Sequence, residues 1–157
     1  MAGNCYPVVL LTQRVLNEHF RDRAEAGARS LVINLSSQMS LAPVPSKRIY
    51  SASKYFDHTF TTALGYECKK VDVLSVMPGF VATNMSGFKQ PNPFKGVISA
   101  EQCAQGILAN STSHLTFGGR LHEVLGLLMR IALDVLPLRV VLSIVGKQAG
   151  IFSRKTK

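Results

Sequence analysis

Apolar residues follow helical spacing in several stretches of the chain. Between residues 5 and 20, the apolar positions that share one helix face are 8, 11, 15, 16 and 20. Gly27 follows in a polar segment that ends this helix. Residues 49–68 contain no proline and one glycine, so they predict a longer second helix. Ser99 and Gln102 have the spacing of a capping box and predict the start of a third.

Three shorter runs predict strands. LVINLS at 31–36 and VDVLSVM at 71–77 are typical of buried strands, and FGGRLH at 117–122 predicts a short edge strand. A polar stretch at 86–96 is long for a connection and is typical of a functional loop. The alternation of helices and strands predicts an α/β fold with a doubly wound parallel sheet and flanking helices.

The segment 124–145 is apolar but interrupted. The residues that interrupt it are Arg130, Asp134, Pro137 and Arg139. Because no run of 18 apolar residues remains, we expect two short helices bent at Pro137 rather than one spanning helix. Such helices lie in a membrane interface or on a partner, or they are core helices of a larger protein. We therefore divide the chain into a unit at 1–122 and an apolar helical tail at 123–157.

Composition narrows the classes of function. The hydrophobic fraction of 46% and the charged fraction of 17% are those of a globular domain and exclude general disorder. The net charge of +9 comes from scattered residues without an aromatic-interleaved stripe, which argues against nucleic-acid binding and suits an acidic ligand or a lipid surface. The three cysteines have no metal-ligand spacing, so we expect no metal site.

Tyr50 and Lys54 are the first candidates for chemistry. Four residues apart on a helix, they share one face, and an ammonium next to a phenol favours the phenolate. Such a pair is a general acid/base, although an exposed helix pair is the commoner meaning of this spacing. Ser37 ends a predicted buried strand, and ligands bind beyond the carboxyl ends of parallel strands. These three side chains are therefore expected to meet on one carbonyl oxygen.

Three motifs occur together in an order that resembles the short-chain dehydrogenase/reductase family. They are Asn-Leu-Ser-Ser at 34–37, Tyr-Ser-Ala-Ser-Lys at 50–54 and Pro-Gly-Phe-Val-Ala-Thr at 78–83. Asn4 lies where the family has its fourth catalytic residue. Leu-Ala-Pro-Val-Pro at 41–45 and the apolar tail resemble the branch of very-long-chain 3-oxoacyl-CoA reductases and 17β-hydroxysteroid dehydrogenases. The resemblance implies a Rossmann-like fold.

The resemblance also implies roles for individual residues. Tyr50 would be the general acid in carbonyl reduction, and Lys54 would lower its pKa and bind the nicotinamide ribose. Ser37 would hold the substrate oxygen, and Asn4 would position a water in the proton relay. The residues expected to contact the cofactor are Tyr50, Lys54, Pro78, Gly79, Val81 and Thr83. The cofactor expected from the branch is NADP(H), and NAD(H) remains open.

The branch further implies a partner and a place in the cell. The substrate would be an apolar ketone, either an acyl-CoA or a steroid, and copies of the chain would pair through the helix at 49–68. The endoplasmic reticulum membrane is the expected location, because residues 154–157 resemble a dilysine-type retrieval signal in which Arg154 replaces a lysine.

A glycine-rich phosphate-binding turn, which family members carry near their start, does not occur in these 157 residues. We therefore expect a C-terminal catalytic half, with an exposed apolar edge at the strand 31–36. Two interpretations follow. In one, this is a shortened form of a reductase with little activity alone. In the other, it is a binding protein or membrane-associated partner that retains relic reductase motifs.

Overall fold

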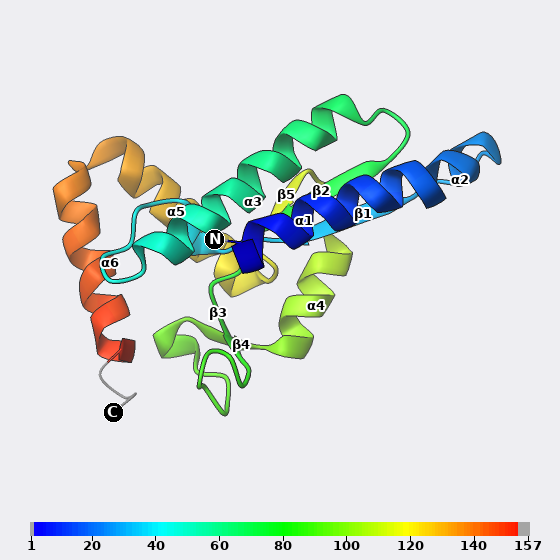
Figure 1. The fold of residues 1–157 in the computed structure, drawn as a ribbon. Helices are drawn as coiled ribbons and strands as arrows, with labels where there is room; N and C mark the ends of the chain where they lie inside the picture. Colours follow the sequence, from blue (N-terminus) through cyan, green and yellow to red (C-terminus); the bar gives the residue numbers. More distant parts are fainter. Residues whose placement is uncertain (1, 154–157) are drawn as a thin grey trace.

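The computed structural model describes residues 2–153 of the chain (Figure 1). Its helices are α1 (Ala2–Val15), α2 (Arg21–Glu25), α3 (Arg48–Glu67), α4 (Ala100–Ala109), α5 (Arg120–Val135) and α6 (Leu138–Ser153). Its strands are β1 (Leu31–Leu35), β2 (Asp72–Val76), β3 (Phe80–Ala82), β4 (Val97–Ser99) and β5 (Leu115–Thr116). A π-helical turn lies at Leu16–Phe20, and 3₁₀ turns lie at Gln38–Ser40 and Pro93–Lys95.

The helices predicted from spacing and capping are present. α1 continues through the π-helical turn into α2, and the chain then passes Gly27, whose φ of +74° suits glycine. α3 matches the helix predicted at 49–68. At the start of α4, Gln102 N donates to Ser99 Oγ (3.0 Å) and Ser99 N donates to Gln102 Oε1 (2.9 Å), which is the predicted capping box.

The predicted parallel sheet is confirmed, with β2 between its two neighbours. The strand order is β1-β2-β5, and the β1–β2 register pairs Leu31 with Asp72 and Leu35 with Val76. β2 is almost wholly buried because it has a parallel neighbour on each side. β1 has only one, and Ile33 and Leu35 keep 38% and 55% of their surface exposed. The apolar edge expected at this strand is therefore present.

The edge strand predicted at 117–122 is wrong. The strand beside β2 is β5, at 115–116, and residues 117–122 form a tight turn and the start of α5. Gly118 (φ +77°) and Gly119 (φ +157°) explain the difference, because these backbone angles are incompatible with continuing a strand. Glu123 stabilises the turn by accepting hydrogen bonds from Thr116 Oγ1 and the Phe117 amide.

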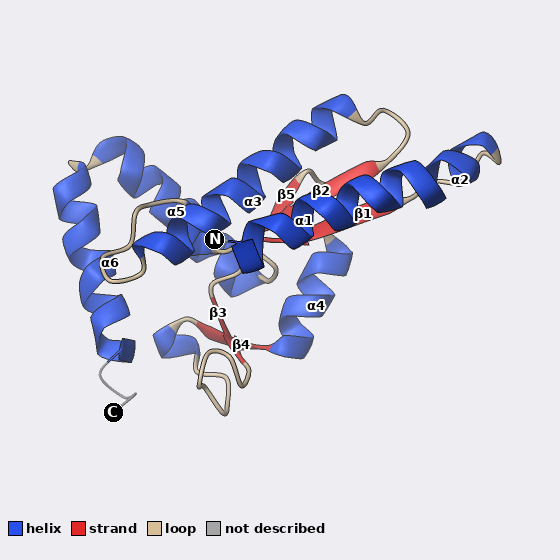
Figure 2. Cartoon of the chain, viewed as in Figure 1, coloured by secondary structure: helices blue, strands red, loops and turns tan. Residues whose placement is uncertain are grey.

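Helices pack against one another and against the sheet. α1 packs against α3, and α3 lies across β1 and β2 (Figure 2). β3 and β4 pair in parallel as a second small sheet, which lies next to α4. The sequence predicted only a loop in this region. β4 follows directly on that loop, and its pairing with β3 fixes the C-terminal end of the loop.

α5 and α6 form the two helices predicted around Pro137. Pro137 lies between the last residue of α5 and the first of α6. α6 packs its buried Val141 and Val145 against Val44, in the proline-containing loop before α3. Among residues 2–153, no helix combines the length and the apolarity that crossing a bilayer requires. The expected retrieval signal at 154–157 lies outside the described residues.

Candidate active site

Lys54 joins α3 to the carboxyl end of β1. Its ammonium donates to the Leu35 carbonyl oxygen (2.8 Å) and to Asp57 Oδ2 (2.9 Å). In the opposite direction, Ser36 Oγ donates to the Lys54 carbonyl oxygen (2.6 Å). Two of these hydrogen bonds link the strand end to the helix, and the one to Asp57 lies within α3. An ammonium has three donors, so one remains for a ligand.

Ser37 follows Ser36 at this strand end and is buried. Its Oγ accepts a hydrogen bond from the Met39 amide (3.2 Å) and caps the 3₁₀ turn Gln38–Ser40. Among the described residues, no acceptor is recorded for the Ser37 hydroxyl proton. A hydroxyl both donates and accepts, so this one keeps its donor for a ligand.

Tyr50 lies one turn before Lys54 in the first turn of α3, where it is half-buried. Its carbonyl oxygen accepts from Ser53 Oγ (2.8 Å), and among the described residues its phenol has no hydrogen-bond partner. Tyr50 and Lys54 share a face of α3 because they are four residues apart. Tyr50 thus lies beyond the end of β1, on the side where Ser37 leaves the strand.

Asn4 reaches α3 from α1. Its Nδ2 donates to Ser53 Oγ (2.9 Å), and Ser53 is fully buried. Cys5 Sγ contacts the Ser53 carbonyl oxygen at 3.8 Å. The structure therefore brings Asn4 to the residue before Lys54, but the amide bonds Ser53 and not Lys54 itself.

The segment 78–83 leaves β2 at the same edge of the sheet as Ser37. The Gln38 amide donates to the Pro78 carbonyl oxygen (3.0 Å), which ties the ends of β1 and β2 together. Farther along β3, Ser86 Oγ donates to the Val81 carbonyl oxygen (2.6 Å), and the Thr83 amide donates to Ser86 Oγ (3.2 Å). Four of the expected cofactor residues thus lie in one continuous segment beside the expected catalytic serine, and the other two, Tyr50 and Lys54, lie on α3.

Two buried titratable residues, Asp57 and His122, were not predicted from the sequence. Asp57 is fully buried, three residues after Lys54, so its helical spacing to the lysine was the only available signal. His122 is also fully buried, at the start of α5, and burial lowers the pKa of its imidazole below the ordinary value. A single histidine at the end of a predicted edge strand gave no signal for its contacts.

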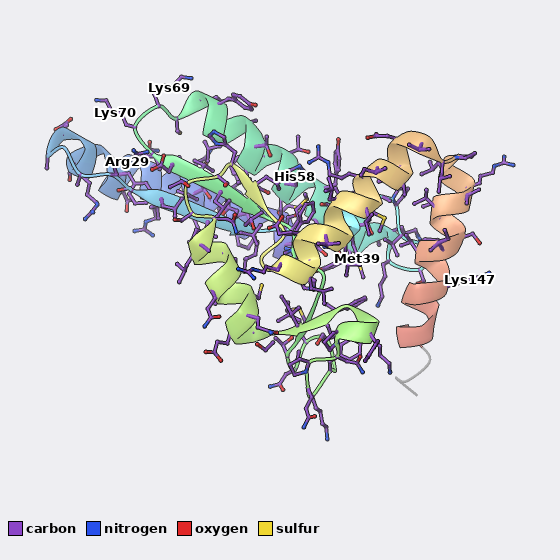
Figure 3. All side chains as sticks on the ribbon, turned by 180° about the vertical axis from the view of Figure 1, so that it is seen from behind. Arg29, Met39, His58, Lys69, Lys70 and Lys147 are labelled. Atoms are coloured by element: carbon purple, nitrogen blue, oxygen red, sulfur yellow. The ribbon has the colours of Figure 1, made fainter. Side chains whose placement is uncertain are left out.

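A cavity of about 580 Å³ adjoins this edge of the sheet. Its walls come from Gln38 and Gly79 on the catalytic side, Phe94 and Gly96 in the loop, and Leu128 and Val145 on α5 and α6. Figure 3 places Met39 beside α5, whereas Arg29, Lys69 and Lys70 gather at the far end of the molecule. The cavity is mainly apolar and reaches Gln38, the residue after Ser37, but Ser37, Tyr50 and Lys54 do not line it.

The fold and motifs agree with comparisons to known proteins. The family model described as short chain dehydrogenase matches residues 1–93, so the chain belongs to the short chain dehydrogenase family. It is similar to very-long-chain 3-oxoacyl-CoA reductase-A of Danio rerio, with 41% identity over 71 residues, 44% of this chain and 22% of that protein. It is also similar to human 17-beta-hydroxysteroid dehydrogenase type 3, with 33% identity over 129 residues, 78% of this chain and 38% of that protein.

A solved structure shows the same fold. A 7beta-hydroxysteroid dehydrogenase aligns with 88% of this chain and 56% of its own, with a TM-score of 0.68 and 19% identity. The chain thus spans between about a fifth and two fifths of the length of the two curated relatives. The parallel sheet, its flanking helices and the order of motifs are those of the family.

Proposed function

We propose that this chain contributes the catalytic residues of an NAD(P)H-dependent carbonyl oxidoreductase. One observation carries the proposal: the ends of β1 and β2 bring Ser37, Lys54 and the Pro78–Gly79 turn to one edge of the sheet, beside an apolar cavity. Tyr50 lies one helical turn from Lys54 on the side of that edge. This proximity supports the roles that the family motifs imply for these residues.

The proposed proton chemistry uses groups that the fold leaves available. Ser37 donates its hydroxyl hydrogen bond to the substrate oxygen and polarises the carbonyl. Tyr50 delivers a proton to that oxygen, and the Lys54 ammonium lies one helical turn away on the same face of α3. Asn4 is proposed to position a water in the relay, and its hydrogen bond to Ser53 supports this by fixing it beside Lys54.

The residues present fit the nicotinamide end of a dinucleotide. Lys54 keeps one free donor for a ribose hydroxyl, and the segment with Pro78, Gly79, Val81 and Thr83 offers backbone groups and a hydroxyl to the carboxamide. A Cβ at Gly79 would come within 2.9 Å of the His122 ring, so this turn requires glycine. When bound, the cofactor supplies the hydride. We propose NADP(H), with NAD(H) as the alternative.

The substrate is proposed to be an apolar ketone, either a 3-oxoacyl-CoA or a steroid, in fatty acid elongation or steroid metabolism. The cavity supports this because Leu128 and Val145 face it and its volume suits a drug-sized apolar group. We also propose that residues 1–122 form the catalytic unit and 123–157 the apolar tail, although α5 begins at Arg120, ahead of that boundary. Pairing through α3 is proposed because Tyr55 and Phe56 are exposed on it.

Substitution of Tyr50 tests the proposal directly. In the full natural protein, Tyr50→Phe is expected to abolish NADPH oxidation with a 3-oxoacyl-CoA or a 17-keto steroid, because phenylalanine cannot donate a proton. Tyr55→Phe is the matched control, since Tyr55 is 59% exposed on the same helix. Retained turnover in Tyr50→Phe contradicts the assignment of the proton donor.

A second candidate function, binding at a membrane surface with or without turnover, is favoured by the outer face of α5. The exposed apolar residues on this face are Val124, Leu127, Ile131 and Val135. They recur at helical spacing opposite the buried His122 and Gly126, so α5 is apolar on two sides. Arg139 and Lys147 are exposed on the adjoining α6, and Figure 3 shows Lys147 at the outer side of that helix. An apolar stripe with basic neighbours suits an anionic membrane surface, in our proposal that of the endoplasmic reticulum.

Vesicle flotation tests this second function. Leu127→Ser is expected to reduce co-flotation with phosphatidylserine-containing vesicles severalfold, because it removes apolar area from the stripe. Leu108→Ser is the matched control, since Leu108 is 66% exposed on α4. Equal flotation of the two variants contradicts docking through α5.

A further inference from the structure

His122 is the point at which three separate chain segments meet. The Gly79 amide donates to His122 Nδ1 (3.2 Å), and His122 Nε2 lies 3.1 Å from the Gly96 carbonyl oxygen. Gln38 Nε2 donates to the His122 backbone carbonyl oxygen (2.9 Å). The imidazole itself is fully buried. One residue of α5 therefore connects the ends of β1 and β2 to the loop before β4.

These contacts assign one protonation state to the ring. Gly79 N–H can only donate, so Nδ1 must accept and carries no proton. The Gly96 carbonyl can only accept, so Nε2 must carry the proton. The neutral Nε2–H tautomer satisfies both partners, whereas an imidazolium would set two donors against each other at Nδ1. Burial acts in the same direction, because it lowers the pKa of His122.

The connected segments have different tasks in the proposed function. Gly79 belongs to the turn proposed to receive the nicotinamide, and Gly96 belongs to the loop that forms a wall of the cavity. Gln38 follows directly on Ser37. The Gly79 backbone and the His122 ring are closely packed, since even a Cβ at Gly79 would lie 2.9 Å from the ring. A shift of the loop at Gly96 must therefore move the ring or break a hydrogen bond.

We propose that His122 is a positioning residue that couples the substrate cavity to the cofactor turn, through Nε2–H to Gly96 and through Nδ1 to Gly79. This inference rests on the proposed reductase function. Each ring nitrogen serves one side: Nδ1 fixes the turn that receives the cofactor, and Nε2–H fixes the loop that encloses the ketone.

Two substitutions separate the two nitrogens. In His122→Asn, the side-chain oxygen can replace Nδ1, but no group reaches Gly96. In His122→Gln, the side-chain nitrogen can replace Nε2–H, but Gly79 N–H loses its acceptor. In the full natural protein, His122→Gln is expected to raise the KM for the dinucleotide about tenfold and to leave the KM for the ketone nearly unchanged. His122→Asn is expected to raise the KM for the ketone about tenfold and to leave the KM for the dinucleotide nearly unchanged. If both KM values change by the same factor in each variant, His122 serves only in packing and the proposal is overturned.

A readout without turnover keeps this test apart from the proposed activity. Amide hydrogen exchange at Gly79 is expected to stay slow in His122→Asn and to accelerate in His122→Gln. The opposite result is expected at the Gly96 amide, which donates to the Pro93 carbonyl oxygen and so reports whether the loop held by Nε2–H stays closed. In the wild-type protein, nitrogen shifts of the imidazole are expected to report the Nε2–H tautomer, which requires no variant to fold. If the wild-type protein shows no turnover but this exchange pattern appears, the reductase function fails and the coupling stands. An Nδ1–H tautomer, or equal exchange changes at both glycines, overturns the coupling.

Discussion

The Lys54 ammonium lies 2.9 Å from Oδ2 of Asp57, a carboxylate that is fully buried. Lys54 keeps 16% of its side-chain surface, so the pair is largely withdrawn from water. Asp57 Oδ1 has no hydrogen-bond partner among the described residues. The lysine proposed to act on Tyr50 is thus also the counter-ion of a buried carboxylate, and its charge serves the stability of the fold as well as the site.

Removal of the charge on Asp57 is expected to destabilise the protein. Asp57→Asn keeps the shape but leaves the Lys54 ammonium without its counter-ion, which is expected to lower the free energy of unfolding by about 1–3 kcal/mol. Urea denaturation measures the change. Asp134→Asn, at an exposed position of α5, is the control and is expected to change stability little. An unchanged midpoint in Asp57→Asn would mean that the pair contributes nothing net.

A methyl group at Gly79 is expected to disturb the site. Its Cβ would lie 2.9 Å from His122 Nε2 and 3.0 Å from Gln38 Oε1, so Gly79→Ala should cost about 1–3 kcal/mol of stability through overpacking. Gly3→Ala is the matched control, because nothing lies within 4 Å of a Cβ there. Thermal unfolding of the two variants measures the difference. Equal melting temperatures would show that the turn is looser than the contacts imply.

Two histidines, the half-buried His58 and the fully buried His122, are expected to make stability depend on pH. Burial lowers the pKa of both His58 and His122 from the ordinary value of 6.5. For His58, the nearby positive charge of Arg130 acts in the same direction. As the pH falls below about 6.5, the unfolded chain takes up protons before the folded chain, so the free energy of unfolding decreases. Above that pH, this contribution is fully present.

Urea midpoints between about pH 7.5 and pH 5.5 test this dependence. His58→Gln and His122→Gln are each expected to flatten the slope, because glutamine does not titrate. His114→Gln, at an exposed position, should leave the slope as in the wild-type protein. A slope that survives replacement of both His58 and His122 would assign the pH dependence to other groups.

The 157-residue chain is expected to bind dinucleotide weakly, with a Kd in about the millimolar range. It contains no glycine-rich turn at a helix N-terminus to hold the diphosphate. Reduced nicotinamide mononucleotide should therefore bind nearly as well as NADPH, and calorimetry with both ligands measures this. Much tighter binding of NADPH would reveal a phosphate site elsewhere in the chain.

Local patterns were sufficient for most of the fold. The capping box at Ser99, the helix break at Pro137 and the β-branched runs each depend on neighbouring residues in the chain, and the structure has all of them. The prediction of an edge strand at 117–122 was wrong because the positive φ angles of Gly118 and Gly119 outweigh the strand propensity of Phe117. The pairing of β3 with β4 was missed because it joins segments separated by a long polar loop.

For the site, residues that belong to motifs were predicted and their supporting contacts were not. The structure places Ser37 and Lys54 at one strand end, as expected from a parallel sheet. The roles of these residues remain predictions. His122 contacts Gly79 and Gly96 across 43 and 26 residues of sequence, and no spacing rule spans such distances.

The capped turn at Gln38–Ser40 has a consequence for the entropy of binding. Because the Met39 amide already holds Ser37 Oγ, the side chain is confined to one rotamer before any ligand arrives. A free hydroxyl side chain would lose that rotational freedom on binding, at a cost of a few tenths of a kcal/mol to about 1 kcal/mol. In this protein the Ser37 side chain loses that rotational entropy during folding. The Met39 backbone amide therefore preorganises the Ser37 hydroxyl for a ligand.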